Sequence, residues 1–120
     1  QSREREVGTL SREMKKIAMV VEDMAVIQLS QLNREADRQL PDGVNYPKPR
    51  LSMLRESGSI EQDSGLVVFI HTVKESGVWN KKLIVAKDRN GSPGKDVPIN
   101  FTMGQFRNYS YEDDNVPENR

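Results

Sequence analysis

The chain has 120 residues, 35% hydrophobic and 30% charged, and its 18 Lys and Arg equal its 18 Asp and Glu. This length is typical of one domain, and the balanced charge gives no net field that would draw the chain onto nucleic acid or an anionic membrane. The absence of cysteine excludes disulfides, thiolate metal ligands and cysteine nucleophiles. We therefore expect a single domain, residues 1–120, that binds no nucleic acid.

An apolar stripe runs along the N-terminal third of the chain. Its first members recur at steps of three and four and are Val7, Leu10, Met14, Ile17, Val21 and Met24. This spacing is the signature of a helix seam, and the later drift of the stripe is typical of a straight helix. We expect one long helix over about residues 3–38. The residues expected to line the principal core are Ile17, Val21, Ala25 and Leu29.

Four residues that break helices, Pro41, Gly43, Pro47 and Pro49, indicate an extended connector over residues 41–50. The β-rich part is expected at residues 51–111, where 51–54 form a short strand or one helical turn and 57–65 a polar loop. A loose acidic tail is expected at 112–120.

Three strands and a further edge strand are predicted within this β-rich part. Leu66–Val73 is an apolar run rich in β-branched residues, and the tight Glu75-Ser76-Gly77 connection predicts a hairpin with a strand at residues 78–87. Asn90-Gly91 is typical of a tight turn with positive φ before a strand at 97–103, and an edge strand is expected at 106–111. The fold class is therefore α+β, a long N-terminal helix packed on an antiparallel sheet of three to five strands.

Few residues are suited to catalysis. His71 is the only histidine and lies in the most apolar strand, where a packed histidine is commoner than a catalyst. Glu22 and Asp23 are neighbours on the expected helix, so they would diverge by about 100° and make no acid/base pair. The sequence has no phosphate-binding glycine loop, serine elbow or zinc-helix motif. We therefore expect that the chain is not an enzyme and binds no cofactor.

Asp88, Asn90 and Asp96 surround Gly91 in a way that resembles a calcium loop, although the glycine directly follows Asn90 instead of lying beyond a third ligand. A turn explains these residues without a metal, so no metal site is expected. Five basic residues gather nearby: Lys81, Lys82, Lys87, Arg89 and Lys95. Trp79 is the only aromatic residue among them, so a nucleic-acid platform is not favoured over lysines that protect a sheet edge.

A long helix, a proline-rich connector and an antiparallel sheet together are similar in outline to the soluble domains of pilins and pseudopilins. The chain also begins at Gln1 within a charged helical pattern, as a soluble part cut just after a membrane anchor would. The resemblance implies a non-enzymatic assembly domain in a membrane-anchored extracytoplasmic machine for secretion, with a periplasmic or extracellular location. A membrane is expected to be contacted only through a segment absent from this chain.

The interaction surface expected for such a domain is the early seam, Val7, Leu10 and Met14. The expected helix would span about 50 Å, at roughly 1.5 Å per residue, and would project beyond a shorter sheet. Partners would be protein subunits, either copies of this chain or other proteins. The alternative is a ligand-sensing domain with a pocket between the helix and the sheet.

Overall fold

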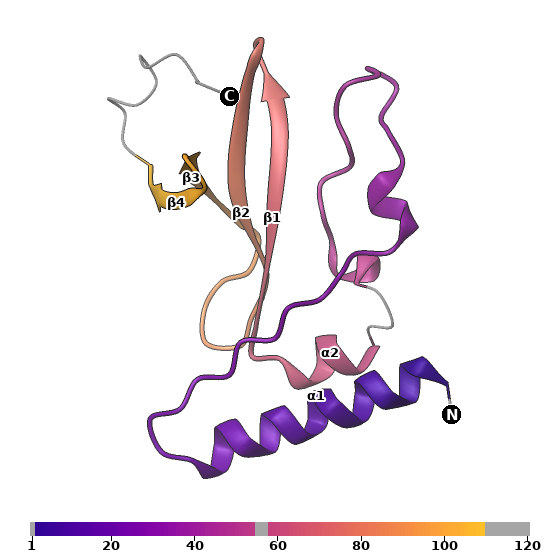
Figure 1. The fold of residues 1–120 in the computed structure, drawn as a ribbon, viewed down its shortest axis with the longest axis vertical. Coiled ribbons are helices and arrows are strands. Elements are labelled where there is room, and N and C mark those ends of the chain that lie inside the picture. The colour runs from indigo at the N-terminus through magenta and orange to yellow at the C-terminus, as the bar shows by residue number, and fades with distance from the viewer. Residues whose placement is uncertain (1, 55–57, 110–120) are drawn as a thin grey trace.

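The computed structural model describes residues 2–54 and 58–109 of the chain and measures 46 × 36 × 27 Å. The helices and strands in chain order are α1 (Arg3–Val20), η1 (Arg34–Asp37), η2 (Leu51–Met53), α2 (Gly58–Asp63), β1 (Leu66–Glu75), β2 (Val78–Asp88), β3 (Lys95–Thr102) and β4 (Gln105–Asn108). Figure 1 shows α1 and α2 at the base of the sheet and the connector standing beside it. The expected α+β class is confirmed.

The four strands form an antiparallel meander in the order β1-β2-β3-β4. β1 and β2 are joined by two residues with positive φ, Ser76 at 50° and Gly77 at 80°, which confirms the predicted hairpin. The predicted strands 66–73, 78–87 and 97–103 are confirmed to within a few residues. The edge strand predicted at 106–111 corresponds to β4. The expected tail at 112–120 lies outside the described residues.

The helix expected over residues 3–38 is about half as long as predicted, because α1 ends at Val20. Val21 is already extended, and Asp23 has the positive φ of 57° that Asp tolerates better than most residues. The segment that follows carries the β-branched pair Val26-Ile27 and has no helix or strand before η1, only a bridge between Leu32 and Leu54. The apolar stripe therefore continued past the point where β-branched side chains ended the helix.

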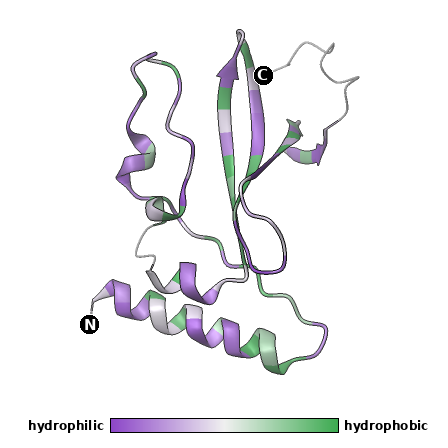
Figure 2. Ribbon diagram, turned by 180° about the vertical axis from the view of Figure 1, so that it is seen from behind, coloured by the Kyte–Doolittle hydropathy of each residue, from purple (hydrophilic) through white to green (hydrophobic). Residues whose placement is uncertain are grey.

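The core predicted along this stripe is wrong. Ile17 and Val21 are 46% and 48% exposed, Leu29 is 92% exposed, and Ala25 also lies on the surface. Figure 2 shows the resulting patch of hydrophobic residues at the end of α1. Among the described residues, the buried hydrophobic cluster instead consists of Leu54, Ile60, Val67, Phe69 and Ile84.

Helix α2 supplies one member of this core, although the segment 57–65 was predicted to be a polar loop. Ile60 is its buried residue, and the backbone oxygens of Glu61 and Gln62 accept hydrogen bonds from the Lys87 ammonium group. Helix α1 packs on α2 at Gly8, where a Cβ atom would lie 2.7 Å from the Ser59 hydroxyl oxygen. The missing side chain of Gly8 thus lets the two helices approach closely.

The turn between β2 and β3 differs from the prediction. Gly91 does not have positive φ, whereas Gly94 does, at 86°. Gly91 suits this position for another reason, because a Cβ atom there would overlap the carboxylate of Asp88. That carboxylate accepts a hydrogen bond from the Asn90 backbone N–H, so it organises a longer loop in place of a two-residue turn.

Candidate functional site

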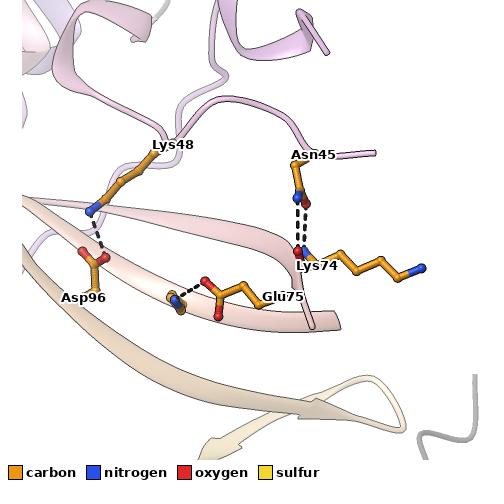
Figure 3. A network of polar contacts seen from close by, with 6 residues as sticks. Asn45, Lys48, Lys74, Glu75 and Asp96 are labelled. Carbon is orange, nitrogen blue, oxygen red and sulfur yellow. Dashed lines mark hydrogen bonds and ion pairs between the residues drawn. The ribbon is translucent and has the colours of Figure 1, made fainter. Parts of the chain in front are cut away.

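The connector is fastened to the free edge of β1 by the side chain of Asn45. Its amide oxygen accepts a hydrogen bond of 2.8 Å from the Lys74 backbone N–H, and its amide nitrogen donates one of 3.1 Å to the Lys74 carbonyl (Figure 3). Asp42 holds Asn45 in place, and hydrogen bonds from the backbone N–H groups of Val44 and Asn45 lower the pKa of the Asp42 carboxyl. The side-chain amide of Asn45 thus pairs with β1 as a neighbouring strand would.

Two ion pairs lie on the same face of the sheet as the core. The Lys48 ammonium is 2.8 Å from a carboxylate oxygen of Asp96 on β3, and the Lys82 ammonium is 2.8 Å from Glu75 (Figure 3). The first pair joins the connector to a strand 48 residues later in the sequence. Both pairs are partly exposed, so each contributes little to stability, and the Lys48–Asp96 pair serves mainly to orient the connector.

His71 lies opposite Lys82 in the β1–β2 register and is half-buried. Desolvation lowers its pKa below 6.5, the ammonium groups of Lys82 and Lys48 lower it further, and the carboxylates of Asp96 and Glu75 act in the opposite direction. His71 is therefore neutral near pH 7 and can accept a hydrogen bond through one ring nitrogen.

A cavity of about 820 Å³ opens between β1 on one side and residues 31–37 and the connector on the other. The lining residues are Gln31, Leu32, Asn33, Arg34, Ala36, Asp37, Tyr46, Pro47, Pro49, Ile70, His71 and Thr72. Asn33 orders this wall, because its side chain donates to the Ser52 carbonyl and accepts from the Glu35 N–H at the start of η1. The lining combines apolar residues with an amide, a guanidinium, an imidazole and the carboxylate of Asp37, which can contact a polar ligand.

Other candidate residues are dispersed. Asp96 is paired with Lys48 and Asp88 with the Asn90 backbone, and the described residues contain no cluster of three metal-ligating side chains. Glu22 and Asp23 are both exposed at the end of α1. None of the helices in the described ranges is long and apolar enough to cross a membrane.

The predicted interaction seam lies on α1 but does not project as a unit. Val7 packs against the buried cluster, Met14 is half-buried, and Leu10 is 57% exposed. The helix is shorter than expected, so the argument from its projecting length no longer applies. The role of these three residues in binding other subunits stays a prediction.

Comparison with known proteins defines the class. The family model for the DnaB-like helicase C terminal domain matches residues 1–110, so the chain belongs to this family. It is 42% identical over 115 residues to the replicative DNA helicase DnaB of Leifsonia xyli, covering 92% of this chain. It is 37% identical over 123 residues to the replicative DNA helicase DnaB of Pasteurella multocida, covering 96% of this chain. No solved structure is significantly similar.

The chain spans 23% of the length of each of these two relatives. It is 34% identical over 126 residues to the replicative DNA helicase DnaB of Mycoplasma pneumoniae, covering 94% of this chain and 25% of that protein. The division of the chain as one domain, residues 1–120, therefore stays a prediction.

Family membership overturns several expectations from the sequence. The interpretation as a non-enzymatic, pilin-like assembly domain is wrong, and so is the alternative of a ligand-sensing domain, because the family and its relatives are helicases. The exclusion of enzymes and of nucleic acid as a partner is wrong for the same reason. The periplasmic or extracellular location, the membrane anchor and the role in secretion are also wrong, because the relatives act in DNA replication.

The balanced charge wrongly excluded nucleic acid as a partner. Net charge is a property of the whole chain, whereas nucleic acid is bound by local groups. Arg34, within the expected helix, and Asn45, in the proline-rich connector, belong to no motif that would mark them as functional. The fold places both beside β1, more than 20 residues later in the sequence.

Proposed function

We propose that this chain is part of a replicative DNA helicase, an enzyme that separates the strands of duplex DNA. The observation that carries the proposal is the match of the helicase family to residues 1–110. Base stacking in duplex DNA is worth about 1.4 kcal/mol per step, so strand separation must be coupled to a source of free energy. Hydrolysis of a nucleoside triphosphate is that source in this proposal.

The cavity beside β1 supports a direct role of this chain in binding the nucleoside triphosphate or the DNA. Both the nucleoside triphosphate and the DNA carry phosphate groups, and the guanidinium of Arg34 at the cavity is suited to bind one. The acidic residue in the lining is Asp37, on the same short helix. Gln31 and Thr72 also line the cavity and carry groups suited to donate hydrogen bonds to a phosphate.

The experiment is nucleoside triphosphate hydrolysis by the full-length protein, with and without single-stranded DNA. We expect hydrolysis that increases when the DNA is added. Arg34→Ala should lower the DNA-stimulated rate by about 10-fold or more, because a charge-assisted hydrogen bond is worth about 1.5–3 kcal/mol.

The matched control is Arg38→Ala, which removes an exposed arginine that follows η1 and does not line the cavity. Its hydrolysis rate should equal that of the wild type. A wild-type protein that hydrolyses no nucleoside triphosphate would contradict the proposed function, and equal rates for the two variants would contradict the part assigned to the cavity.

A further inference from the structure

The loop that joins β2 and β3, residues 89–94, contains the dipeptide Asn90-Gly91 (Figure 1). Asn90 is the only asparagine in the chain that is followed by glycine. The backbone nitrogen after an asparagine can attack the side-chain amide carbon and close a five-membered ring. Glycine favours this attack, because it has no Cβ atom to hinder the approach and its backbone adopts conformations that other residues avoid. Asn90 is therefore a candidate for a covalent reaction with its own backbone.

The structure leaves the attacking nitrogen available. Asn90 and Gly91 are both exposed, and the loop has no helical or strand residues. Among residues 2–54 and 58–109, none accepts a hydrogen bond from the Gly91 backbone N–H. A backbone N–H within a helix or strand would have to break a hydrogen bond before it could react. The Gly91 nitrogen has no such bond to another described residue.

The two ends of the loop are held, whereas its middle is not. The Arg89 backbone N–H donates a hydrogen bond of 2.8 Å to the Gly65 carbonyl, and the Gly94 N–H donates one of 2.7 Å to the Val85 carbonyl. These bonds fix the backbone on both sides of Asn90-Gly91 without engaging the nitrogen between them. The reaction can therefore take place without unfolding of either strand.

Asp42-Gly43 is the matched comparison within the chain, because an aspartate before glycine can close the same ring. Here the Gly43 N–H donates a hydrogen bond of 2.9 Å to the Leu40 carbonyl. The Asp42 carboxylate accepts hydrogen bonds from two backbone N–H groups, which lower its pKa and keep it ionised, and a carboxylate is a poor target for a nucleophile. Both residues are exposed. Hydrogen bonding, and not exposure, thus distinguishes Asp42-Gly43 from Asn90-Gly91.

We propose that Asn90 is a site of spontaneous deamidation in the folded protein. The Gly91 nitrogen loses its proton and attacks the side-chain amide carbon of Asn90, and the adduct expels ammonia and leaves a succinimide. Water then opens the ring at either of its two C–N bonds. Cleavage of the new bond gives aspartate, and cleavage of the original peptide bond gives isoaspartate. The net reaction consumes one water molecule and releases one ammonia, so it requires no oxidant or reductant.

The products change the loop in two ways. Either product adds one negative charge, and isoaspartate also adds a methylene to the backbone between the anchored positions Arg89 and Gly94. Asn90→Asp reproduces the charge alone and so separates the two effects. The inference is independent of the proposed function, since it rests on the chemistry and hydrogen bonding of this loop.

The test follows the full-length protein during incubation at mildly alkaline pH, either folded in buffer or unfolded in guanidinium chloride. Mass spectrometry of tryptic peptides should show a gain of about one dalton in the peptide that begins at Asn90, and labelling by an isoaspartyl methyltransferase detects isoaspartate. We expect the folded and unfolded proteins to react at Asn90 at rates within a few-fold of each other. Isoaspartate at Asp42 should form much faster in the unfolded protein than in the folded one.

The matched control is Asn90→Gln, which keeps the amide but would have to close a less favourable six-membered ring, so its peptide should keep its mass. Gly91→Ala is not suitable, because the added Cβ would overlap the Asp88 carboxylate. An Asn90 that stays intact in the folded protein and deamidates in the unfolded one would overturn the proposal, because the loop would then protect it. An equal mass gain in Asn90→Gln would overturn it as well, since another residue would be the source.

Discussion

At the scale of single residues, His71 shows how a neighbour on the next strand sets the protonation state of a side chain. The imidazole is half-buried, lines the cavity and faces the Lys82 ammonium. Burial and this positive charge both disfavour a second positive charge. The His71 side chain therefore acts as a neutral hydrogen-bonding group in the wall of the cavity.

The lowered pKa of His71 predicts a pH-dependent stability. The unfolded chain takes up a proton at His71 near pH 6.5 while the folded chain does not, so the free energy of unfolding should fall as pH drops from 7.5 through 6.5 toward the lower folded pKa. Urea unfolding at pH 7.5 and 5.5 measures this loss. His71→Gln should lose less stability over the same range, and an identical loss would show that other groups cause it.

At the scale of elements, the close packing of α1 on α2 depends on Gly8. Gly8→Val should lower the free energy of unfolding by roughly 1–3 kcal/mol, because its side chain would overlap the Ser59 hydroxyl. The matched control is Gly58→Val, where an added Cβ has no atom within 4 Å. Urea unfolding that ranks the two variants in the opposite order would show that α1 does not pack on α2 at this point.

The attachment of the connector to the edge of β1 should depend on Asn45. Asn45→Ala removes both hydrogen bonds to the Lys74 backbone, at a cost of about 1–2 kcal/mol, and should expose the Lys74 amide to solvent. Hydrogen exchange at Lys74 is the readout. Asn45→Asp keeps an acceptor for the Lys74 N–H but loses the donor, so its exchange should be intermediate. Unchanged exchange in the Ala variant would mean that the connector does not hold the edge of β1.

The elements that could be predicted from the sequence are those specified by neighbouring residues. Ser76-Gly77 and the β-branched run 66–73 determine the first hairpin locally, and the structure has both. The helix was extended too far because the spacing of apolar residues through Ala25 and Leu29 suits a helix, while the β-branched residues Val20, Val21 and Val26 disfavour one. In this segment the branching of the side chains, and not the apolar periodicity, determines where the helix ends.

At the scale of the whole molecule, the core and the candidate site could not be predicted, because both depend on contacts between distant segments. Ile60 lies in a segment of polar residues and becomes buried only when α2 meets β1 and β2. The cavity requires residues 31–37 and the connector to lie against β1. Local patterns contain no information on these arrangements.

The measurement that tests the helicase assignment most directly is strand displacement by the full-length protein on a forked duplex. We predict that the labelled strand is released when a hydrolysable nucleoside triphosphate is present and retained when a non-hydrolysable analogue replaces it. Arg34→Ala should slow the release, and Arg38→Ala should not. A folded protein that hydrolyses the nucleoside triphosphate and releases no strand would contradict the assignment.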